Sequence, residues 1–109
     1  MTALTVEPRS AQFNASGGTC QHQLQNNRFA RLAFKLKSTN NEHYRFTPAY
    51  GFIEPQRTAS FTIKRLPAQA GDDKLIIQFA EVAFDCTDPK APFMAYAEQG
   101  EIIMPISAI

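Results

Sequence analysis

Alternation of apolar and polar residues along short runs is the feature of this sequence that most restricts its fold. In residues 58–64, Ala59, Phe61 and Ile63 fall on one side, and residues with hydroxyl or charged side chains fall on the other. Successive side chains of a β-strand point to opposite faces, so this period of two predicts a strand with one buried face. No segment carries a helical period over three turns. The sequence therefore predicts an all-β protein.

Other runs repeat the pattern, each with its own inward-facing set. The predicted inward-facing residues are Leu4 and Val6; Cys20, His22 and Leu24; Ala30, Leu32, Phe34 and Leu36; Leu75, Ile77 and Phe79; and Ile102, Met104 and Ile106. Clusters of Gly, Asn, Asp, Ser and Pro separate the runs, and they supply backbone conformations that strands lack. Pro8 is expected to end or bend the first strand, with Phe13 in its continuation. About seven or eight short strands are typical of an antiparallel sandwich.

Length and composition set the broad class. The chain has 109 residues, of which 44% are hydrophobic and 19% charged, so we expect a single domain over residues 1–109. The formal net charge of +1 gives no overall field that would attract nucleic acid. No apolar run is long enough to cross a membrane, and the N-terminus lacks the pattern of a signal peptide. We therefore expect a cytoplasmic protein with no membrane insertion.

The two cysteines, Cys20 and Cys86, are separated as in the disulfide of an immunoglobulin domain. No Trp lies between them, and a cytosolic chain keeps its thiols reduced, so we expect no disulfide. Cys20 and His22 could present two metal ligands on one strand face. Structural zinc needs four ligands with a characteristic spacing, and His43 lacks a spaced partner. We interpret His22 as a half-buried structural residue and expect no metal and no cofactor.

Motifs of catalysis are absent from the sequence. It contains no glycine-rich phosphate loop and no nucleophile elbow, and its acidic residues are scattered over turns and strand ends. Exposed aromatic residues do not alternate with the basic ones as a nucleic-acid stacking platform requires. We expect a protein that is not an enzyme, although a dispersed active site stays open as an alternative.

A family likeness is concentrated in residues 34–55. Residues 34–40, FKLKSTN, resemble a strand of the major sperm protein domain that ends in Lys-Thr-Thr. Residues 44–48 are similar to that family's next strand and proline, and residues 51–55 to its Gly-apolar-Ile-x-Pro element. Residues 4–8, 74–79 and 104–106 match in order. The resemblance implies an immunoglobulin-like, seven-stranded antiparallel β-sandwich with the architecture of bacterial pilus chaperones.

The resemblance also implies a function. The chain is similar to the small, single-domain, sperm-specific members found in nematodes, whose filament-forming relatives dimerise and polymerise to drive sperm crawling. It therefore implies a non-enzymatic protein–protein interaction module of sperm cytosol, associated with the cytoskeleton and motility. Protein partners, including a second copy in a homodimer, are expected.

Membrane-associated members of the same family imply an alternative. They grip acidic, Phe-containing (FFAT-like) peptides on one sheet face, which by position comprises Lys37, Ser38, Thr39, Lys74 and Ile76 here. Alternation independently turns Lys74 and Ile76 outward, and a basic strip beside an apolar residue suits such a peptide. The same residues are also consistent with a solvated sheet face that carries one exposed apolar side chain.

Prolines and a glycine are expected to shape the connections. Pro48 and Pro55, with Gly51 between them, predict a rigid link that moves the chain between the sheets. Pro105 faces outward and cannot donate to a ladder, so we expect either that the last strand is an edge strand or that Pro105 lies on its unpaired side.

The long connection over residues 86–100 carries several apolar residues. Phe93, Met94 and Tyr96 are predicted to fold back onto the sandwich, with a mobile loop as the alternative.

Overall fold

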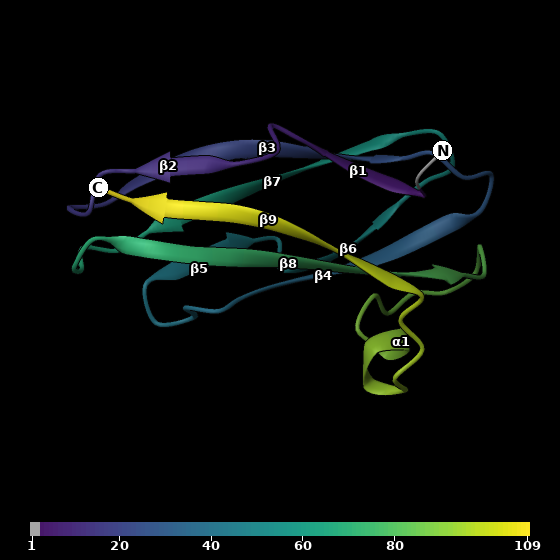
Figure 1. Cartoon of the computed structure of the whole chain (residues 1–109). Coiled ribbons are helices and arrows are strands. Elements are labelled where there is room, and N and C mark those ends of the chain that lie inside the picture. The colour runs from purple at the N-terminus through teal and green to yellow at the C-terminus, as the bar shows by residue number, and fades with distance from the viewer. Residues whose placement is uncertain (1–2) are drawn as a thin grey trace.

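The computed structural model describes residues 3–109 as two packed β-sheets (Figure 1). In spatial order, the four-stranded sheet contains β1 (Leu4–Glu7), β3 (Gly18–Asn26), β7 (Thr58–Arg65) and β5 (Tyr44–Thr47). The five-stranded sheet contains β2 (Ala11–Phe13), β9 (Gly100–Ala108), β8 (Gly71–Val82), β4 (Arg31–Ser38) and β6 (Tyr50–Ile53). The short helix α1 (Ala91–Met94) lies outside the two layers at one end. All the strand pairs are antiparallel except the parallel pair of β2 and β9.

Two strands break in the middle and change sheets. β1 pairs with β3, and beyond Pro8 the chain continues as β2, which pairs with β9. β5 pairs with β7, and beyond Pro48 it continues as β6, which pairs with β4. Both breaks fall at prolines, which lack the N–H that a ladder needs. With each broken strand taken as one, the nine described strands become seven, and the predicted immunoglobulin-like antiparallel sandwich is confirmed.

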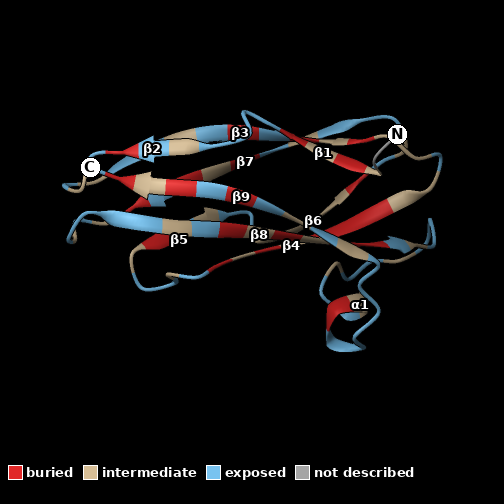
Figure 2. Cartoon of the chain, in the orientation of Figure 1, coloured by how far each residue is buried: buried red, intermediate tan, exposed pale blue. Residues whose placement is uncertain are grey.

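Most of the predicted inward-facing residues are buried between the two sheets, and Figure 2 colours the buried stretches of the strands red. Thirteen of them belong to the buried core, with Phe13, Tyr44 and Ile53 beside them; the thirteen are Leu4, Val6, Leu24, Leu32, Phe34, Leu36, Phe61, Ile63, Leu75, Ile77, Phe79, Met104 and Ile106. Cys20, Ala59 and Ile102 are only partly buried against this core. Ala30 was expected in the next strand, but it lies just before β4 and is partly exposed.

The connections at Pro48 and Pro55 carry the chain between the layers. The first leads from β5 into the five-stranded sheet, and the second leads from β6 back to β7 in the four-stranded sheet. Between them, Gly51 lies against the ring of Phe34. A Cβ at Gly51 would fall 2.7 Å from two atoms of that ring, so this position has no room for a larger residue.

The long connection between β8 and β9 is anchored at two points. Phe93 of α1 is buried against Tyr50, with 6.1 Å between ring centroids. Arg31 donates a hydrogen bond of 2.7 Å from Nη1 to the carbonyl oxygen of Cys86. The prediction that this segment folds back is therefore correct for Phe93. It is wrong for Met94 and Tyr96, which are exposed.

Candidate functional site

The outer face of the five-stranded sheet brings together the central predicted residues. Lys37 on β4 is the register partner of Ile76 on β8, and Ile76 is in turn the partner of Ile103 on β9. Side chains directly opposite each other in antiparallel strands lie about 5 Å apart at Cβ. A lysine and two isoleucines therefore form one row across three strands. Ile103 is 47% exposed, whereas Ile76 between its neighbours is partly buried.

The next row shows how this face ends. Lys74 is exposed and lies opposite Pro105, and its neighbours Asp72 and Asp73 bring negative charge to the same end. Thr39 completes a hollow of about 190 Å³ with these three residues of β8. The positive charge of Lys74 is thus offset by carboxylates close by, while Lys37 has none opposite it in the register.

The two hydroxyl residues predicted for the site are engaged within the protein. Ser38 is only 6% exposed, and its Oγ accepts a hydrogen bond of 3.0 Å from the N–H of Asn40. Thr39 is exposed, but its Oγ1 accepts a hydrogen bond of 2.9 Å from the N–H of Lys74 and donates one of 3.3 Å to Asp73. The structure therefore places Ser38 at the end of β4, facing inward and bonded to the turn that follows. It brings Lys37, Thr39, Lys74 and Ile76 together at the surface.

Aromatic side chains flank the other end of this face. Nζ of Lys35 and Nζ of Lys90 lie 5.8 and 5.4 Å from the ring centroid of Tyr50, within the range of cation–π attraction. The guanidinium of Arg31 lies 3.7 Å from the ring centroid of Phe52 and forms an ion pair with Glu54. Arg31 thus holds the loop and sheet together, and its charge is already paired with Glu54. Lys35 has the outward parity of β4, but these ring contacts depend on where β6 and the segment around α1 lie, and they were not predicted.

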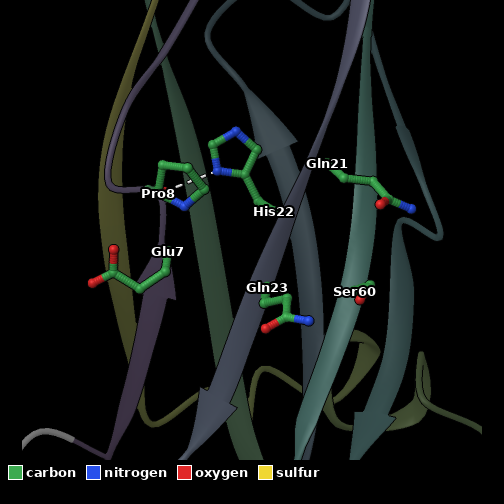
Figure 3. A pocket seen from close by; sticks show the side chains of 6 residues that line it. All are labelled: Glu7, Pro8, Gln21, His22, Gln23 and Ser60. Atoms are coloured by element: carbon green, nitrogen blue, oxygen red, sulfur yellow. Dashed lines mark hydrogen bonds between the residues drawn. The ribbon is translucent and has the colours of Figure 1, made fainter.

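A separate cavity of about 380 Å³ lies where the chain bends between β1 and β2 (Figure 3). His22 is 3% exposed, and its Nδ1 lies 2.9 Å from the carbonyl oxygen of Pro8, toward which the ring points in Figure 3. A carbonyl only accepts, so Nδ1 carries the proton and Nε2, 3.3 Å from Sγ of Cys20, is the acceptor. Stacking on Phe61 completes the enclosure. His22 ties β3 to the bend, a structural role, and it is fully rather than half buried.

Two titratable side chains have pKa values that burial raises. Burial raises the pKa of the Cys20 thiol, which disfavours the nucleophilic thiolate. Burial also raises the pKa of Tyr44, against the opposing effect of the nearby Arg65 guanidinium. Within residues 3–109, no three or more His, Cys, Asp or Glu side chains gather as metal ligands. Cys20 and Cys86 carry free thiols.

Comparison with known proteins decides the family. The MSP (major sperm protein) domain profile matches residues 3–101. The chain belongs to the major sperm protein domain family. It is 47% identical to sperm-specific class P protein 31 of Caenorhabditis elegans over 96% of this chain and 98% of that protein. It is 50% identical to sperm-specific class P protein 32 of the same organism over 91% of this chain and 92% of that protein.

Solved structures agree with this assignment. The structure of WR4, a C. elegans MSP family member, superposes with a TM-score of 0.95 at 44% identity, and each chain is covered completely. A PapD-like domain of human CEP192 shares the fold at 13% identity, with a TM-score of 0.68, over 98% of this chain and 84% of that chain. The names of the sperm-specific relatives describe no catalytic activity. Within the described part of the chain, no helix has the length and apolar character needed to span a bilayer.

Proposed function

We propose that this chain is a non-enzymatic protein–protein interaction module of sperm cytosol, associated with the major sperm protein cytoskeleton. Its sperm-specific relatives, matched over nearly their whole length, support the cellular setting. The row of Lys37, Ile76 and Ile103 supports contact with another protein, because it joins a charge to apolar side chains on the outer face of one sheet. Self-association of the domain into a homodimer is part of the same proposal.

Co-sedimentation tests the cytoskeletal role. Filaments assembled from purified major sperm protein are pelleted with increasing amounts of this chain, and bound protein is measured in the pellet. The proposal expects saturable binding. A chain that stays in the supernatant at every concentration added contradicts it. Sedimentation equilibrium of the chain alone tests the homodimer, which a single monomeric species at high concentration would rule out.

A second candidate function is the binding of acidic, Phe-containing peptides by the same face. The observation that favours it is the direct pairing of Lys37 with Ile76, which places a cation beside an apolar residue. Titration with such a peptide should show saturable binding that weakens with salt, because exposed charges are screened. Lys37→Glu and Lys74→Glu should each weaken binding. Lys64→Glu, the same charge change at an exposed position of the other sheet, should not. No saturable binding at low salt would exclude this candidate.

A further inference from the structure

One edge of the five-stranded sheet is open where β9 passes β1. β2 pairs with β9 only at residues 106–108, and β1 pairs with β3 in the opposite sheet. Residues 101–105 of β9 therefore have a strand neighbour, β8, on one side only. Figure 1 shows β9 running past β1, which lies in the other layer.

Hydrogen bonding at β4 fixes which backbone groups face this edge. Lys74 accepts a hydrogen bond from the N–H of Thr39, and its own N–H donates to the Thr39 hydroxyl. The backbone groups of Lys74 therefore point toward β4. Because successive residues of a strand direct these groups to opposite sides, those of Leu75 and Ile77 point toward β9.

The same parity continues into β9. The register partners of Leu75 and Ile77 are Met104 and Ile102, whose backbone groups must point back toward β8. The N–H and C=O groups of Glu101 and Ile103 then point to the open edge. In residues 3–109, no hydrogen bond from another strand reaches them. Pro105 has no N–H to leave unpaired on that side, which agrees with the unpaired side expected for it.

Beside this edge the surface is hollow and mainly apolar. A hollow of about 310 Å³ is lined by Leu4, Thr5, Val6, Arg9, Ile102 and Ile103. A second hollow of about 260 Å³ shares Leu4 and Ile102 with it and continues along the same seam. Apolar side chains that enter this seam would leave water, which favours association. The seam between β1 and β9 thus offers main-chain hydrogen bonds and apolar space together.

We propose that this seam binds an extended segment of another protein, which adds to β9 as a further strand and inserts alternate apolar side chains between β1 and β9. Main-chain pairing gives affinity in this mode, and alternate side chains give specificity. If a second copy paired with this edge through its own β9, the hollow of one copy would lie beside the hollow of the other, and neither would be filled. A single inserted strand would fill the hollow with its side chains. The inference goes beyond the proposed function. The seam shares the Ile103 side chain with the row around Lys37, but it would recognise its partner through the open backbone edge of β9 and the hollow beside β1, which that row does not include.

The probe is the peptide Lys-Thr-Val-Thr-Val-Thr-Val-Thr-Lys, titrated into ¹⁵N-labelled protein. A control peptide of the same composition has its valines together. We expect saturable shifts of the Glu101 and Ile103 amides, slower hydrogen exchange at both, and weaker binding of the control. No saturable binding of the alternating peptide overturns the proposal, as does equal binding of the control.

Variants at Ile103 test the backbone role. Ile103→Pro removes the N–H that faces the edge without touching the β8 ladder, and its ring obstructs an added strand. It should weaken binding about tenfold or more, equivalent to at least about 1.4 kcal/mol. Ile103→Thr keeps the N–H and should bind more tightly than Ile103→Pro. Thermal melts confirm that both variants are folded, and unchanged affinity in a folded Ile103→Pro overturns the proposal.

Two further measurements separate this inference from its rivals. Lys37→Glu should leave peptide binding unchanged, so loss of binding there would move the peptide to the basic face and overturn the seam proposal. If the free protein is a dimer and Ile103→Pro dissociates it, the edge binds a second copy, and the seam proposal is overturned. If only the filament co-sedimentation fails, the proposed function is contradicted and the seam proposal is not.

Discussion

Gly51→Ala is expected to destabilise the sandwich through a single added methyl group. The new Cβ would lie 2.7 Å from Cε2 and Cζ of Phe34, whereas ordinary contacts begin at 3.4 Å. Phe34 is 1% exposed, so its ring has nowhere to move without displacing other core residues. Overpacking of this kind typically costs about 1–3 kcal/mol of unfolding free energy. For a domain of this size, that corresponds to a fall in Tm of about 4–12 °C.

Denaturant unfolding and thermal melts measure this effect, and two further variants identify its cause. Gly71→Ala is the matched control, because a Cβ there meets nothing within 4 Å, and it should change stability by less than about 0.5 kcal/mol. Phe34→Leu and Gly51→Ala should not be additive, because the smaller side chain relieves the contact, so the double variant should lose less stability than the sum of the two single losses. If Gly51→Ala is as stable as Gly71→Ala, the close approach of β6 to Phe34 is wrong.

Two other predictions concern buried polar groups. Asn26→Ala should lower the free energy of unfolding by about 2–4 kcal/mol, because its amide donates to the carbonyls of Ala30 and Ile53. Urea unfolding measures this loss, and a value below about 0.5 kcal/mol would contradict it. Burial raises the pKa of Cys20 and the pKa of Tyr44 above their ordinary values of 9.0 and 10.0. The unfolded chain therefore loses these protons at lower pH than the folded protein does, and the free energy of unfolding should fall as pH rises past 9.0. Urea midpoints at about pH 8 and about pH 10.5 measure this fall, and equal midpoints would contradict it.

The sheet layout could be predicted because alternation is a local property of the sequence. The period of two placed Phe61 and Ile63 inward and Lys74 and Ile76 outward, and prolines marked the sheet changes. The same parity extends to Arg65, which is buried with its Cζ 4.9 Å from the ring centroid of Tyr44. That burial was not predicted, because Tyr44 reaches Arg65 through the pairing of β5 with β7, which sets the two residues opposite each other in the register.

The candidate face was predicted in part for the same reason. Ser38 shares the parity of Leu36 and faces inward, so its place in the site, which came from family resemblance, conflicts with the pattern of its own strand. Ile103 alternates with Met104 and could have been assigned to the outer face from sequence. The contacts of Tyr50 with Lys35, Lys90 and Phe93 could not be predicted, because they depend on how the segment around α1 folds back over β6.

Filament co-sedimentation of two charge-reversal variants tests the central claim most directly. Lys37→Glu changes the outer face of the five-stranded sheet, and Lys64→Glu makes the same change on the other sheet. If partners meet the face around Lys37 and Ile76, Lys37→Glu should lose filament binding by about tenfold while Lys64→Glu binds as the wild type does. Equal binding by both variants would contradict the claim.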